Sequence, residues 1–89
     1  MYRISDDVLI QEMDEYAMVY LTRDGIIHVV NSVAAYILQL ILEGKQTESI
    51  VSAVEEKYIS NVGSVQDDIN SFLQTALELK IIQKDEERN

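Results

Sequence analysis

The chain has 89 residues, of which 47% are hydrophobic and 26% charged, and a chain of this size and composition folds around a single core. It has no cysteine and one histidine, which excludes disulfides, thiol nucleophiles and metal sites rich in cysteine or histidine. The formal net charge of −9 disfavours binding to nucleic acid and to anionic membranes. The apolar runs are shorter than the ~20 residues that span a bilayer, so we expect a cytoplasmic protein.

The first third of the chain has the composition of β-strands. Residues 1–7 mix charged and isolated apolar side chains, and we expect them to be loose. Strands are predicted over 8–12, 16–22 and 26–30, which are rich in β-branched and aromatic residues. Asp24 and Gly25 favour the positive φ angles of a tight turn, so the second and third strands should form an antiparallel hairpin.

From residue 31 the apolar positions follow a helical period. Residues 31–43 predict a helix buried nearly all round, with Asn31 as its N-cap and Gly44 at its end. A surface helix should begin at Thr47 as its cap, and an amphipathic helix should begin at Ser64 and run to about Lys80. The polar residues 83–89 predict a disordered tail, which leaves 1–82 as a single domain.

Three strands followed by three helices predict an α+β fold, with a small three-stranded antiparallel sheet and its helices segregated beside it. The third strand would be an edge of this sheet if it is outermost. It carries neither the proline nor the lysine that usually protect such an edge. The sequence therefore predicts an open groove between this strand and the third helix.

No residue combination in the chain indicates catalysis. His28 lies between apolar neighbours on a predicted strand, and a packed strand residue explains it better than a general base. Three helices beside a sheet also fit a DNA-binding winged helix, but the third helix carries acidic residues where phosphate contacts would require lysine or arginine. DNA binding is therefore disfavoured by the sign of the charge. We predict no catalytic residue, no metal site and no cofactor.

A set of short motifs between Asp24 and Ile82 resembles the PqqD-like family, the recognition elements for ribosomally made, post-translationally modified peptides (RiPPs). In that family an acidic-glycine hairpin leads to an apolar residue and asparagine, small residues, and an aliphatic helix that ends in glycine. The corresponding residues of the first half are Asp24, Gly25, Val30, Asn31, Ala34, Ala35, Ile37, Leu38, Leu40 and Gly44. Those of the second half are Thr47, Ile50, Val51, Asp68, Ile69, Phe72 and Leu73. The chain departs from the pattern at Lys80, where the family often has glycine, and at Ala76-Leu77.

The resemblance implies a winged-helix-like fold without catalysis that holds a leader peptide as an added strand between the third strand and the third helix. The predicted peptide-binding residues of this sequence are Ile26, Ile27, His28, Val29, Val30, Asp67, Asn70, Ser71 and Gln74. Side chains alternate between the two faces of the strand, so the sequence alone does not decide which face lines the groove. The family has a buried residue before the asparagine, which suggests that Val30 points to the core. We therefore expect Ile27 and Val29 to lie nearer the groove.

The resemblance also implies partners. A stand-alone chain of this family would deliver a precursor peptide to a modifying or cleaving enzyme in RiPP or PQQ-type biosynthesis. A radical SAM enzyme, a leader peptidase with a lasso cyclase, and a heterocycle-forming enzyme all remain open. The alternatives from other classes are a winged-helix DNA-binding regulator and a small homodimerisation module that pairs its exposed edge with a second copy. We expect no nucleic-acid or membrane partner, and a monomer or a weak homodimer.

Overall fold

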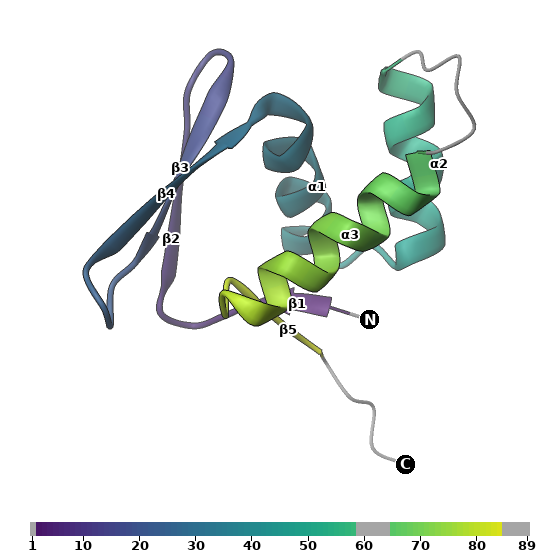
Figure 1. Ribbon diagram of the computed structural model, residues 1–89. Helices are drawn as coiled ribbons and strands as arrows, with labels where there is room; N and C mark the ends of the chain where they lie inside the picture. The colour runs from purple at the N-terminus through teal and green to yellow at the C-terminus, as the bar shows by residue number, and fades with distance from the viewer. Residues whose placement is uncertain (1, 59–64, 85–89) are drawn as a thin grey trace.

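The computed structural model describes residues 2–58 and 65–84. Strands β2, β3 and β4 form an antiparallel sheet in that order, and helices α1, α2 and α3 lie beside it (Figure 1). The described elements are β1 Tyr2–Ile4, β2 Val8–Glu12, β3 Tyr16–Leu21, β4 Ile26–Asn31, α1 Ser32–Leu42, α2 Thr47–Lys57, α3 Val65–Glu78 and β5 Ile82–Lys84. The predicted α+β class, with a three-stranded sheet followed by three helices, is confirmed.

The core lies around α1, which packs against the sheet, β1 and α2. Six of the eleven residues of α1 are buried, as its nearly continuous apolar sequence predicted. The inner face of the sheet contributes the buried residues Val8, Ala17, Val19 and Leu21. Helices α2 and α3 add their apolar stripes, so α1 is enclosed between the sheet and the other two helices.

Local signals set both ends of α1. The Oδ1 atom of Asn31 accepts a hydrogen bond of 2.8 Å from the backbone N–H of Ala34, which confirms the predicted N-cap. Gly44 follows the helix with φ +83°, a left-handed conformation that glycine adopts readily. The prediction for α2 was wrong in one detail, because Gln46 holds the N-cap position and makes no side-chain cap bond. Ser64, the predicted cap of α3, lies outside the described residues.

The hairpin between β3 and β4 has a longer connection than the tight turn predicted at Asp24 and Gly25. Leu21 pairs with Ile26, so the connection comprises the four residues 22–25. The N–H groups of Asp24 and Gly25 both donate to the carbonyl of Leu21, and Gly25 has φ +70°. The glycine therefore provides the positive φ that its position suggested, but within a longer loop.

A second, two-stranded sheet joins the two ends of the described chain. Tyr2 pairs with Lys84 and Ile4 with Ile82, antiparallel, and the N–H of Ser5 donates to the carbonyl of Ile81. The predictions of a loose segment at 1–7 and of a tail from residue 83 were therefore wrong for the residues in β1 and β5. Ile81 and Ile82 are both buried, and their burial fixes the strand that follows α3. Residues 85–89 of the predicted tail lie outside the described residues.

The end of α3 shows why the family often has glycine at the position of Lys80. This residue has φ +66°, and the N–H of Ile81 donates to the carbonyl of Ala76 across it. Such a C-terminal motif usually places glycine in the left-handed position, because a side chain there costs about 1–2 kcal/mol. Lysine therefore occupies a position at which glycine would relieve backbone strain.

Replacing this residue should stabilise the fold. We expect Lys80→Gly to raise the free energy of unfolding by about 0.5–1 kcal/mol, the relief of strain less the added entropy of the unfolded chain. Urea unfolding followed by circular dichroism measures the change. Lys45→Gly is the matched control, since Lys45 is exposed and has no positive φ, and it should be neutral or destabilising. Equal effects of the two substitutions would contradict the strain at Lys80.

Candidate functional site

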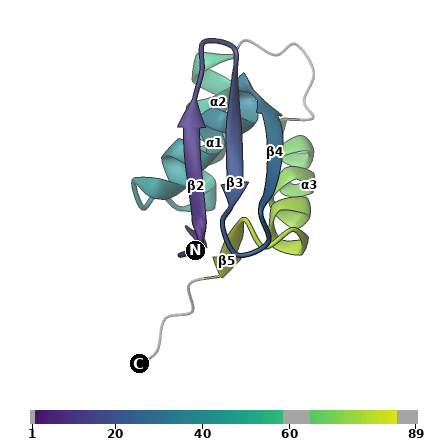
Figure 2. The ribbon, with the colours of Figure 1, turned by 90° about the vertical axis from the view of Figure 1, so that its left-hand side faces the viewer.

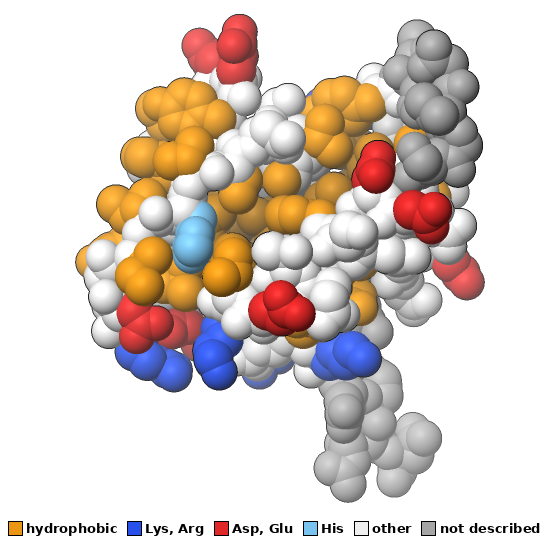
Figure 3. Space-filling model, in the orientation of Figure 1, with side chains coloured by type: hydrophobic (Ala, Val, Ile, Leu, Met, Phe, Trp, Pro, Cys, Tyr) orange, Lys and Arg blue, Asp and Glu red, His pale blue; other side chains and the backbone are white. Residues whose placement is uncertain are grey.

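Strand β4 is an edge of the three-stranded sheet. Within the described residues it is hydrogen-bonded to β3 alone, and its other margin faces α3 (Figure 2). Helix α3 packs against α2 and β5, whereas β4 packs against β3 and α1. The surface between β4 and α3 is a hollow lined by apolar side chains (Figure 3). The predicted open edge beside the third helix is therefore present.

The backbone groups on this free edge follow from the hydrogen-bond register. The N–H of Met13 donates to the carbonyl of Tyr16 over 2.8 Å, so Tyr16 turns its backbone groups toward β2. Alternate residues of an antiparallel strand bond to opposite neighbours, so the odd-numbered residues of β3 bond to their even-numbered partners in β4. The free edge presents the N–H and C=O groups of the remaining residues Ile27 and Val29, and the N–H of Asn31, whose carbonyl belongs to the first turn of α1.

The side chains of β4 alternate between two faces of the sheet. Ile26, His28 and Val30 stand opposite buried residues of β3 and share the face that the helices cover. The prediction that Val30 points toward the core is confirmed, because Val30 is half-buried against the core cluster. The expectation that Ile27 and Val29 lie nearer the groove was wrong for their side chains, which are 57% and 66% exposed on the opposite face.

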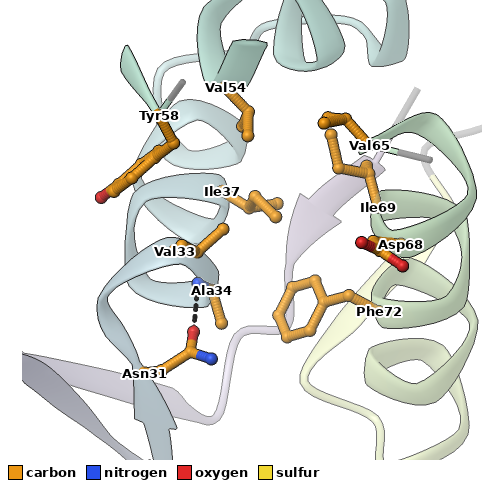
Figure 4. Close-up of a pocket in the computed structure, with 10 residues that line it drawn as sticks. All are labelled: Asn31, Val33, Ala34, Ile37, Val54, Tyr58, Val65, Asp68, Ile69 and Phe72. Atoms are coloured by element: carbon orange, nitrogen blue, oxygen red, sulfur yellow. Dashed lines mark hydrogen bonds between the residues drawn. The ribbon is translucent and has the colours of Figure 1, made fainter. Parts of the chain in front are cut away.

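A pocket of about 440 Å³ continues the hollow at the start of α1 and α3 (Figure 4). Its walls are mostly apolar, and Asn31, Tyr58 and Asp68 contribute the polar groups. The phenyl ring of Phe72 points across the pocket toward α1 in Figure 4. The residues that line it are Asn31, Val33, Ala34, Ile37, Val54, Tyr58, Val65, Asp68, Ile69 and Phe72. The pocket can therefore hold a large apolar side chain, with a carboxylate in its wall.

The chemistry available in this pocket is limited. Its lining has one carboxylate, at Asp68, and one phenol, at Tyr58, whose hydroxyl donates over 3.4 Å to the carbonyl of Ser32. Residues 2–58 and 65–84 contain no group of three acidic, histidine or cysteine side chains that could hold a metal ion. The mostly apolar lining favours contact with an apolar group.

The sequence of residues 15–82 matches the family described as coenzyme PQQ synthesis protein D (PqqD). The chain belongs to the PqqD family. The match extends the resemblance seen from Asp24 to Ile82 toward the N-terminus, so that it includes β3. No curated protein matches the chain.

Two solved structures are similar to this PqqD-family chain over nearly its whole length. "TbiB1 in Complex with the TbiA(beta) Leader Peptide" is 25% identical, with a TM-score of 0.84, and the match covers 96% of this chain and 99% of that one. "Lasso peptide synthetase B1 complexed with the leader peptide" is 18% identical, with a TM-score of 0.82, and covers 93% and 98%. The fold of the chain is therefore that of these small proteins.

The structure does not bring all predicted site residues of this PqqD-family chain to the hollow. The predicted residues of β4 border the hollow, Ile27 and Val29 with their backbone groups and the other three with their side chains. The four polar residues predicted from α3 are exposed. At 100° per residue they lie on other sides of the helix from the pocket-lining Val65, Asp68 and Phe72. The four are Asp67, Asn70, Ser71 and Gln74.

Sequence reasoning missed the pocket side of α3, although a signal for it was present. Val65, Asp68 and Phe72 are spaced by three and four residues, which places them on one side of a helix. Asp68 and Phe72 were also part of the family pattern. The side of α3 that faces β4 depends on how the helix rotates about its axis, and the buried Ile69, Leu73 and Ala76 set that rotation.

Proposed function

We propose that this chain binds the leader segment of a ribosomally made precursor peptide and delivers it to a modifying or cleaving enzyme. The leader would add to β4 as a fourth strand in the groove beside α3. The single observation that carries the proposal is the unpaired edge of β4 next to an apolar hollow. Strand addition uses main-chain hydrogen bonds for affinity and side-chain pockets for the choice of peptide.

The register of β4 supports this mode of binding. Ile27 and Val29 hold their N–H and C=O groups toward the groove, where an added strand would pair with them. The pocket beside Asn31 would receive a side chain of the leader, and Phe72 would form its far wall. In this arrangement β4 supplies the hydrogen bonds and α3 the apolar contact.

The family and the fold support the same proposal. The chain belongs to the PqqD family, and the similar TbiB1 structure contains a leader peptide. The pocket lining includes no histidine, cysteine or lysine, which supports a binding rather than a catalytic role. The net charge of −9 favours encounter with neutral or basic leader segments. A DNA-binding role is not favoured, since α3 carries no lysine or arginine and has Asp67 and Asp68 in its first turn.

Titration of the ¹⁵N-labelled chain with the leader segment of a precursor peptide from its own source tests the proposal. We expect the amide resonances of residues 26–34 and 65–72 to shift most, because these backbone segments border the groove and the pocket. The amides of the exposed side of α2, such as Ser52 and Glu56, serve as the internal reference. Shifts spread over α2 and the β1–β5 sheet, with β4 unaffected, would contradict the proposal.

A further inference from the structure

No described helix or strand covers the face of the sheet that points away from the helices (Figure 2), and most of the side chains on this face are apolar. We call it the outer sheet face. In the pairing register Leu9, Tyr20 and Ile27 form one row across the three strands. The next row consists of Met18 and Val29 with the uncharged Gln11 on β2. Most of these side chains are well exposed, with Leu9 at 60% and Val29 at 66%. Contiguous apolar surface of this kind marks interaction sites on small proteins.

The charges around this face indicate what covers it. No acidic or basic side chain lies in the two rows, whereas Asp14 and Glu15 lie in the turn at one end and Asp24 in the turn at the other. Arg23 lies near Asp24 but forms an ion pair of 3.3 Å with Asp7. The rim is therefore acidic, and a complementary partner would present an apolar patch bordered by lysine and arginine.

A second copy of the chain fits this face less well. Three strands about 4.8 Å apart and five residues long cover roughly 250 Å² in projection, which is small for a stable dimer that uses this face alone, whereas an enzyme would also contact the bound leader beside it. A copy would also bring a further net charge of −9 to an acidic rim. The face suits a transient partner of opposite charge.

We propose that the outer sheet face docks the enzyme that receives the bound leader, through a basic-rimmed apolar patch on that enzyme. This rests on the proposed function, because a leader added to β4 would extend the same sheet. Its alternate side chains would then emerge on the outer sheet face beside Ile27 and Val29. The enzyme would contact the chain and its cargo on one continuous surface, so the loaded chain would bind it better than the empty one.

Leu9→Lys tests the docking face without touching the groove. Leu9 lies on β2, two strands away from the free edge of β4, and its outward side chain tolerates a charge. The probe is the purified enzyme that modifies or cleaves the same precursor peptide, titrated against the leader-saturated protein. We expect its affinity to fall at least tenfold, while the affinity for the leader alone stays within twofold.

Leu42→Lys is the matched control, since Leu42 is 57% exposed at the end of α1, away from the outer sheet face. It should change neither affinity. Unchanged enzyme binding by Leu9→Lys would overturn the docking face and leave the proposed function intact. Loss of a sedimenting dimer in Leu9→Lys with unchanged enzyme binding would identify a homodimer interface instead. Failure of the wild-type chain to bind the leader would overturn the proposed function itself.

Discussion

Val29→Pro should weaken leader binding by about 30- to 150-fold, or roughly 2–3 kcal/mol, while the domain stays folded. The N–H of Val29 points to the free edge of β4, so proline removes no hydrogen bond between β3 and β4. It removes a donor for the added strand, and its ring obstructs the approach of the peptide backbone. Fluorescence anisotropy with a labelled leader measures the affinity, and urea unfolding measures the stability.

Two further variants of β4 test whether the N–H of Val29 points to the free edge and that of His28 to β3. Val29→Thr keeps the N–H and a β-branched side chain, so it should bind the leader within about threefold of the wild type. His28→Pro removes an N–H that bonds to β3, so it should lower the free energy of unfolding by about 3 kcal/mol. If Val29→Pro binds like the wild type, the leader does not add as a strand to this edge.

The second large effect concerns the sheet at the chain ends. Ile82→Ala should lower the free energy of unfolding by about 2–5 kcal/mol, because Ile82 is 1% exposed and its loss leaves a cavity in the core. The midpoint of urea unfolding should fall with an unchanged slope. Leader affinity at a temperature well below the unfolding transition should persist, since β5 follows the far end of α3 from the pocket.

Gln83→Ala provides the comparison at the neighbouring residue. Gln83 is exposed and pairs with Arg3 through its backbone, so this substitution should change the stability by less than about 0.5 kcal/mol. A similarly small effect of Ile82→Ala would mean that β5 does not belong to the core.

The three-stranded sheet and the helices were predictable because their signals are local. The period of α1, its cap at Asn31 and its end at Gly44 are all encoded within the segment itself. The pairing of β1 with β5 has no such signal. Each strand has three residues, and Tyr2 meets Lys84 from the opposite end of the chain. Burial of Ile81 and Ile82 against the core is a property of the whole fold, and it places Gln83 and Lys84 where they pair with β1.

The position of the candidate site was predictable, but the side chains that form it were not. Absence of proline and lysine from β4 indicated a free edge, and α3 was expected beside it. The face on which Val29 lies depends on which residues of β3 are buried, and Ala17 and Val19 decide this in the folded protein. Likewise the polar residues Asn70 and Gln74 seemed suited to a groove, whereas packing of α3 turns Asp68 and Phe72 toward it.

Pairing of Tyr2 with Lys84 brings residues near both termini to within one strand spacing of each other, at the base of the fold in Figure 1. A linker of a few residues between these strands would therefore close the backbone into a ring without distorting the sheet. New ends could then be opened in an exposed turn such as Asp14–Glu15. For the same reason the domain is suited to insertion within a host enzyme, which could carry its own peptide receptor while the β4 margin stays accessible.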